Sequence, residues 1–105
     1  MHLEKTFGET IRDLRTANHL TLREVAESLK IDTSMLGKIE KNNRKPSKQL
    51  IKDISKLFHI SENELTIAHL SDTVVYSILE EELASEVLKV AEEKINYYNK
   101  NKTVK

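Results

Sequence analysis

Three Ser/Thr-x-x-Glu capping boxes divide this chain into short helices and leave little room for any other secondary structure. The boxes are Thr6 with Glu9, Thr21 with Glu24, and Ser61 with Glu64. In such a box the Ser or Thr hydroxyl accepts a hydrogen bond from the backbone N–H of the glutamate three residues later. The carboxylate of that glutamate accepts a hydrogen bond from the backbone N–H of the Ser or Thr. Apolar residues at helical spacings of three and four follow each box. The pattern predicts an all-α fold.

The chain's helix stops complete this division. The predicted helices cover about residues 6–18, 21–29, 32–41, 46–58, 62–79 and 82–99. Lys30-Ile31 form a tight connection, after which Asp32 can cap the third helix, and Asn42-Asn43 can supply the left-handed residue that ends it. Two glycines and one proline in 105 residues fit an all-helical chain. We expect a domain over residues 1–70, a helical extension over 71–105, and a frayed polar tail from Asn99.

Composition excludes several classes of function. The chain has no cysteine, so it has neither disulfides nor thiolate metal sites, which suits a reducing cytoplasm. No apolar run approaches the roughly 20 residues that a membrane span needs. The four histidines lie far apart without metal-ligand spacing, and there is no Gly-rich phosphate loop. We therefore expect no enzyme activity, no metal, no cofactor, and a cytoplasmic, nucleoid-associated protein.

A net charge of zero hides an asymmetry along the chain. Residues 1–61 carry twelve Lys and Arg against eight Asp and Glu, whereas residues 62–105 carry five against nine. Seven of the basic residues lie within 38–56, beside only Glu40 and Asp53. Such a cluster is expected of a face that binds a polyanion, although a solvated helix surface would show the same charge.

The second and third helices carry a more specific pattern. Their sequence, LREVAESLKIDTSMLGKIEK, resembles the helix-turn-helix of the Cro/CI-type (Xre) family of repressors. Ala26 matches the small residue where the two helices cross. Three apolar positions match those that fix their angle: Leu29, Leu36 and Ile39. The run IEKNNRKPS resembles the family's I-E-x-G-x-R-x-P-S. The resemblance covers about residues 6–70 and implies a five-helix lambda-repressor-like DNA-binding domain.

Three departures from the family pattern affect what the resemblance implies. Lys30 and Asn42 stand where the family usually has glycine. A non-glycine residue there either adopts positive φ at a steric cost or changes the backbone so that positive φ is not needed. Leu22 stands where a polar residue is frequent, which removes a phosphate contact. We expect the domain geometry to survive with one DNA-backbone contact missing.

The resemblance places the third helix in the major groove of double-stranded DNA, with its N-terminal residues facing the base edges. The residues implied in DNA binding are Thr33, Ser34, Gly37, Lys38, Lys41, Asn42, Asn43, Arg44, Lys45 and Ser47. Lys38 can reach guanine O6 and N7, and Arg44 fits a phosphate or the minor groove. Two explanations of Gly37 remain open: its missing side chain lets the helix lie closer to a base, or the glycine arose by neutral sequence drift on an exposed face. The resemblance also implies a buried structural ion pair between Arg15 and Glu40.

The last helix has its own apolar seam. Ala84, Leu88, Ala91, Ile95 and Tyr98 are spaced 4, 3, 4, 3, as in a coiled coil, and Leu83 and Val87 widen the stripe. The seam predicts a homodimer interface, with a helix folded back on its own domain as the alternative. The predicted function is a homodimeric transcriptional regulator, a repressor or autoregulator, on a palindromic operator. The alternatives are an antitoxin whose C-terminal helices bind a toxin partner, and a restriction–modification controller.

Overall fold

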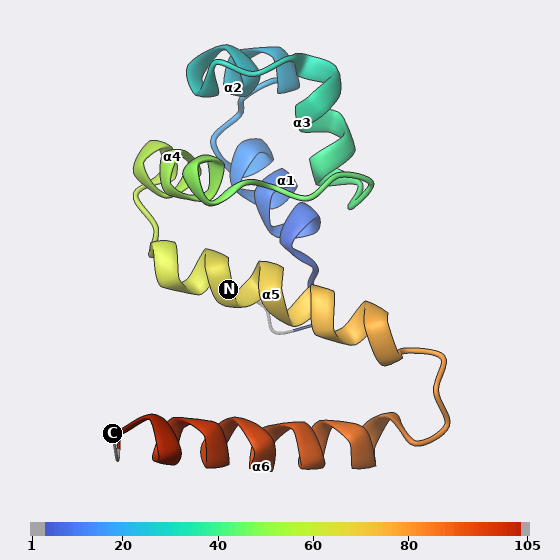
Figure 1. The fold of residues 1–105 in the computed structure, drawn as a ribbon. Coiled ribbons are helices and arrows are strands. Elements are labelled where there is room, and N and C mark those ends of the chain that lie inside the picture. Colours follow the sequence, from blue (N-terminus) through green and yellow to red (C-terminus); the bar gives the residue numbers. More distant parts are fainter. Residues whose placement is uncertain (1–3, 104–105) are drawn as a thin grey trace. The chain divides into compact units, whose positions relative to one another are not determined.

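The computed structural model describes residues 4–103, which form six α-helices and no strand (Figure 1). The helices are α1 (Phe7–Ala17), α2 (Leu22–Leu29), α3 (Thr33–Glu40), α4 (Lys48–Phe58), α5 (Glu62–Ile78) and α6 (Ala84–Thr103). The chain divides into two compact units, Met1–Thr73 and Val74–Lys105. The all-α fold class predicted from the sequence is confirmed.

The first two capping boxes make both of their reciprocal hydrogen bonds. At the start of α1 the Glu9 N–H donates to Thr6 Oγ1 at 3.2 Å, and the Thr6 N–H donates to Glu9 Oε1 at 3.0 Å. Thr21 and Glu24 make the same pair of bonds at the start of α2, at 3.1 and 3.0 Å. Hydrogen bonds from the threonine N–H groups stabilise the carboxylates and lower the pKa of both glutamates.

The later helix starts follow the prediction less completely. Ser47 Oγ accepts from the Leu50 N–H at 3.0 Å and caps α4, while Ser61 Oγ accepts from the Glu64 N–H at 3.2 Å. Asp32 occupies the cap position of α3, but its side chain makes no capping hydrogen bond. That part of the prediction is wrong, because the carboxylate of Asp32 does not reach the N–H groups of the first turn.

Each of the first four helices ends one or two residues before a left-handed residue that is not glycine. The residues with positive φ are His19, Lys30, Asn42 and His59. Lys30, at φ 59°, closes α2, and the following Ile31 N–H donates to the Ala26 carbonyl at 3.0 Å. A lysine in this conformation costs about 1–2 kcal/mol relative to glycine. The turn geometry therefore survives the departure at Lys30, and Asn42, at φ 63°, is the predicted helix stop.

The core of the first unit is built from apolar residues of α1 to α5. Its members are Phe7, Ile11, Val25, Ala26, Leu29, Leu36, Ile39, Leu50, Ile51, Ile54, Leu65 and Ala68. Ala26 is 1% exposed where α2 packs beside α3. Leu22 is half-buried and packs against the same core. Leu22 at the start of α2 thus adds to the packing of the core.

Helix α5 is tied to the first turn of α1. The Phe7 N–H donates to Asp72 Oδ2 at 2.7 Å, and the Phe7 ring meets the His69 ring edge-on with 5.8 Å between centroids. Asp72 thereby satisfies one of the N–H groups that a helix start leaves without an intrahelical acceptor. The contact brings residues 7 and 72 of one compact unit together.

The second unit contains the end of α5 and the whole of α6. Helix α6 begins at Ala84 and continues through Thr103, which is four residues past the predicted end at Asn99. The predicted frayed tail is therefore helical as far as Thr103, and residues 104–105 lie outside the described part of the chain. No helix among the described residues is long and apolar enough to cross a membrane.

Candidate DNA-binding surface

Helix α3 presents one polar face to solvent and one apolar face to the core. Thr33, Ser34 and Lys38 are exposed, whereas Leu36 and Ile39 are fully buried. A Cβ built on Gly37 meets no atom within 4 Å, so the glycine borders open space. Figure 1 shows α3 following α2 across a short turn. The side chains predicted to reach base edges therefore share the exposed face of one helix.

A buried ion pair fixes α3 against α1. Arg15 Nε donates to Glu40 Oε2 at 2.8 Å and Arg15 Nη2 donates to Glu40 Oε1 at 3.0 Å, so the pair is bidentate. The side chains are only 14% and 5% exposed. The hydrogen bond with Glu40 raises the pKa of the Arg15 guanidinium. Arg15 Nη1 also donates to the Leu20 carbonyl at 3.0 Å, which ties the same side chain to the α1–α2 loop.

Gly8 sets the distance between α1 and the end of α3. A Cβ at this position would lie 2.5 Å from the carbonyl oxygens of both Ile39 and Glu40, and 2.7 Å from Asn42 Oδ1. Because two of these neighbours are backbone atoms, no side chain can rotate away to make room. This role of Gly8 was not predicted from the sequence. The available signal was a glycine in the first turn of a capped helix, where alanine would be a better helix former.

Asn42 uses its side chain inside the domain. Its Oδ1 accepts from the Gly8 N–H at 3.1 Å, and its Nδ2 donates to Thr6 Oγ1 at 2.9 Å. The residue therefore links the end of α3 to the first turn of α1. Both polar atoms of the Asn42 amide already have partners, so Asn43 is the more available of the two predicted asparagine contacts.

The loop between α3 and α4 is basic and exposed. Arg44 and Lys45 have no hydrogen bond or ion pair with other described residues, and both are exposed. The first N–H groups of α4, including that of Lys48, have no acceptor within the helix. Helix N-termini of this kind bind phosphates through their N–H groups and dipole. Ser47 lies at this end, but its hydroxyl is engaged in capping α4.

The acidic residues near this loop do not cancel its positive charge at the surface. All seven basic residues are exposed: Lys38, Lys41, Arg44, Lys45, Lys48, Lys52 and Lys56. Of the two acidic residues in the same stretch, Glu40 is buried against Arg15, which leaves only the half-buried Asp53 to oppose seven basic side chains. The exposed side of α3, the loop and α4 therefore carries positive charge, which attracts a polyanion such as the phosphate backbone.

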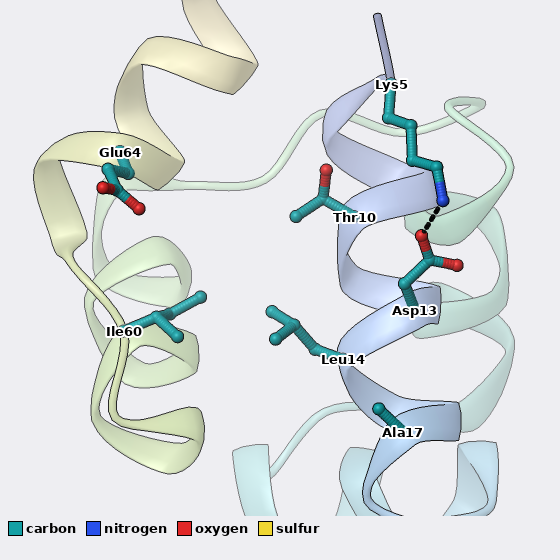
Figure 2. A pocket seen from close by; sticks show the side chains of 7 residues that line it. All are labelled: Lys5, Thr10, Asp13, Leu14, Ala17, Ile60 and Glu64. Carbon is teal, nitrogen blue, oxygen red and sulfur yellow. Dashed lines mark hydrogen bonds and ion pairs between the residues drawn. The ribbon is translucent and has the colours of Figure 1, made fainter. Parts of the chain in front are cut away.

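A hollow of about 280 Å³ lies elsewhere in the first unit, between α1 and the start of α5. Figure 2 shows Leu14 and Ile60 facing each other across it, with Glu64 on α5 and with Asp13 on α1 paired with Lys5, which precedes α1. None of the predicted DNA-contacting residues lines it. Within residues 4–103 no three His, Cys, Asp or Glu side chains gather into a potential metal site.

The predicted dimerisation residues lie on α6, apart from Leu83, which directly precedes this helix. Leu83 is 65% exposed, Val87 42% and Tyr98 68%, while Ala84 and Ala91 are half-buried. Across the described residues, every exposed large hydrophobic side chain lies between Ile67 and Tyr98. An apolar surface of this extent is typical of an interaction site.

The α2–turn–α3 arrangement, the buried ion pair behind it and the basic loop beyond it define a helix-turn-helix DNA-binding domain. A helix-turn-helix family model matches residues 11–65 of this chain. The chain belongs to the Cro/CI-type (Xre) helix-turn-helix family of transcriptional regulators, as the sequence resemblance predicted.

Two regulators are similar in sequence. The uncharacterized HTH-type transcriptional regulator YazB of Bacillus subtilis (strain 168) is 39% identical over 59 residues, which are 56% of this chain and 86% of YazB. The HTH-type transcriptional activator BcrR of Enterococcus faecalis is 31% identical over 84 residues, which are 80% of this chain. The match spans only 39% of BcrR's length.

Two solved structures share the fold. The clp gene regulator ClgR from Corynebacterium glutamicum superposes with a TM-score of 0.55 at 21% identity, over 81% of this chain and 88% of that one. A chain of the SinR protein/SinI protein complex superposes with a TM-score of 0.53 at 22% identity, over 93% and 99%. At these identities the likeness shows the fold alone, which agrees with the five-helix domain and its helical extension.

Proposed function

We propose that this regulator binds a palindromic operator as a homodimer and represses transcription, including that of its own gene. The observation that carries the proposal is the exposed polar face of α3, held in place from behind by the Arg15–Glu40 pair. A major groove about 12 Å wide admits one such helix with its N-terminal residues toward the bases.

Within this proposal the residues of the surface divide by role. Thr33, Ser34 and Lys38 face base edges, and Gly37 lets the backbone of α3 approach the groove floor. Arg44, Lys45 and the N-terminus of α4 hold phosphates, which sets the register of α3 without reading sequence. Lys41 and Asn43 add further backbone contacts at the end of α3.

A homodimer gives the specificity that one short helix lacks. Two copies related by a two-fold axis present two recognition helices about 34 Å apart, one turn of DNA between half-sites. The exposed apolar residues of α6 support this assembly because an unpartnered surface of this kind is costly in water. The same surface could instead bind a different protein, since the SinR protein/SinI protein complex joins two proteins, and a chain of that complex shares this fold.

The first test compares three alanine variants of the full chain by fluorescence anisotropy. The probes are a DNA site selected from a random pool by the wild-type protein, and a scrambled duplex of the same length. Lys38→Ala should lower the preference for the selected site about 5- to 150-fold, which corresponds to the roughly 1–3 kcal/mol that a bidentate base contact contributes. Arg44→Ala should weaken binding to both duplexes.

Lys89→Ala serves as the matched control, since it removes the same charge from exposed α6. It should leave both affinities unchanged. Equal losses on both duplexes for Lys38→Ala would make Lys38 a phosphate contact. Affinity should also fall steeply with added salt, because binding releases counterions from several phosphates. An affinity insensitive to salt would contradict the assignment of the basic face.

The direction of regulation is tested with a reporter fused to the protein's own promoter. Repression predicts that reporter output rises when the gene is deleted. Reporter output that falls on deletion of the gene would instead show that the protein is an activator. The relative BcrR is named as a transcriptional activator.

A further inference from the structure

The chain leaves α3 through Asn42, a left-handed residue at φ 63°. The Asn42 N–H donates to the Ile39 carbonyl at 3.0 Å, and the next N–H, that of Asn43, donates to the Lys38 carbonyl at 2.8 Å. These two bonds form the Schellman arrangement that ends many helices, and it requires positive φ at the residue in the position of Asn42. Glycine adopts this conformation freely, and asparagine is among the residues with a side chain that adopt it most readily. The backbone therefore explains a glycine or an asparagine here equally well.

The side chain of Asn42 does work that a glycine would leave undone. Its Oδ1 accepts from the Gly8 N–H at 3.1 Å, and its Nδ2 donates to Thr6 Oγ1 at 2.9 Å. A Cβ on residue 8 would lie 2.7 Å from the same Oδ1, so the amide occupies space that a side chain at Gly8 would take. We call the contact of Asn42 with Thr6 and Gly8 the Asn42 clamp. It attaches the end of α3 to the first turn of α1.

The basic loop that follows is held at its two ends. The Asn42 clamp lies at one end, and at the other the Ser47 hydroxyl accepts from the Leu50 N–H at 3.0 Å and caps α4. Between these ends, Arg44 and Lys45 are exposed and make no hydrogen bond or ion pair with other described residues. Arg44 is the second residue after Asn42. Its backbone is therefore placed by the way in which the chain leaves residue 42.

We propose that Asn42 is a positioning residue for DNA binding, which through its clamp on α1 holds the backbone of Arg44 where the guanidinium meets a phosphate. The inference rests on the proposed function, in which Arg44 contacts the DNA backbone, and adds the residue that holds it in place. Both polar atoms of the Asn42 amide are engaged within the domain, so Asn42 acts through Arg44. Holding a contacting residue in place before binding reduces the conformational entropy that is lost on binding.

A double-mutant cycle in the full chain tests this role. Asn42→Gly removes the amide and keeps a residue that adopts positive φ, so that α3 ends as before. Affinity for the selected and the scrambled duplex is measured for the wild type, Asn42→Gly, Arg44→Ala and the double variant. Asp72→Ala, alone and combined with Arg44→Ala, is the matched control, because it removes the neighbouring hydrogen bond in the same turn of α1, from the Phe7 N–H at 2.7 Å. Thermal unfolding sets a temperature at which every variant is folded.

The loss of affinity caused by Arg44→Ala should be at least about twofold smaller in Asn42→Gly than in the wild type, the lower limit of coupling between residues that act together. It should be unchanged in Asp72→Ala. Equal losses with and without the Asn42 amide would give Asn42 a purely structural role and overturn the proposal. An equal reduction in Asp72→Ala would also overturn it, because general loosening of α1 would then explain the result.

Failure of the proposed function gives a different result. If Arg44→Ala left the wild-type affinity for both duplexes unchanged, Arg44 would not contact DNA, and the phosphate contact would fail together with the positioning role. Hydrogen exchange of the Gly8 N–H measures the clamp without DNA. Exchange should be faster in Asn42→Gly than in the wild type, and an unchanged rate would contradict the clamp itself.

Discussion

The two compact units treat their apolar side chains in opposite ways. Among the described residues, every buried hydrophobic side chain lies between Phe7 and Ala68, and every exposed large one lies between Ile67 and Tyr98. The first unit encloses one core, and of its described large hydrophobic side chains only Ile67 and Leu70 are exposed. The second unit is one long helix and the end of another, which cannot enclose a core. The contrast supports the proposal that the extension is covered by a second copy of the chain.

The two units also differ in how their polar groups are used. In the first unit, side chains of Thr6, Arg15 and Asn42 bond across helices and fix α3 relative to α1. In α6 the glutamates and lysines from Glu86 to Lys100 are exposed. Rigid internal networks of the kind found in the first unit hold the residues of a binding site in place.

The largest expected effect comes from breaking the ion pair behind α3. Arg15→Ala leaves Glu40 buried without its partner, which should lower the free energy of unfolding by about 3 kcal/mol, the lower end of the range for buried pairs. Urea denaturation at a fixed protein concentration measures this change. Arg23→Ala is the matched control, because its ion pair with Glu27 is exposed, at 82% and 69%. It should have little effect. Equal losses would mean that the pair does not organise the first unit.

The two glycines should respond in opposite directions to alanine. Gly8→Ala forces α1 away from the carbonyls of Ile39 and Glu40 and should destabilise the protein by about 2–3 kcal/mol. Gly37→Ala meets open space and should stabilise α3 by about 1 kcal/mol. Thermal unfolding of both variants gives the comparison. If Gly8→Ala were as stable as the wild type, the close approach of α1 and α3 would not be a constraint.

DNA binding by the more stable Gly37→Ala variant addresses the question that the sequence left open. Weaker binding to the selected site, with unchanged binding to scrambled DNA, would show that the glycine makes room for a base. Unchanged binding to both would assign Gly37 to drift on an exposed face.

A charge placed in the α6 seam should separate the two units functionally. Leu88→Asp should raise the dimer dissociation constant at least about tenfold, because burying one leucine contributes about 1.5–3 kcal/mol. Operator affinity should fall with it, while the circular dichroism of the first unit's helices persists. Asn96→Asp adds the same charge away from the seam and is the control. A Leu88→Asp variant that still sediments as a dimer would contradict the assigned interface.

The smallest expected effect is a dependence of stability on pH in the first unit. The pKa values of Glu9 and Glu24 are lowered in the folded state, so their contribution is complete above the ordinary value of 4.5 and is lost as the pH falls through the folded values. Glu9→Gln combined with Glu24→Gln should flatten the acid side of a stability–pH curve. An unchanged curve would mean that other carboxylates control acid unfolding.

Local sequence signals were sufficient for the helices of the first unit, because capping boxes and apolar spacing act within a few residues. The contacts that were missed connect residues far apart in sequence. The Phe7–Asp72 and Gly8–Asn42 hydrogen bonds depend on how α1, α3 and α5 pack, and no short pattern encodes them. Likewise, the helicity of residues 100–103 was underestimated because their polar composition resembles a frayed tail.

The central claim, that α3 reads DNA from a two-fold dimer, is tested most directly by a hydroxyl-radical footprint on the DNA upstream of the protein's own gene. The account predicts two protected half-sites of inverted sequence, with centres about one helical turn apart. Leu88→Asp should lose both half-sites together at concentrations where the wild type protects them. A single protected half-site for the wild type, or protection without sequence preference, would contradict the account.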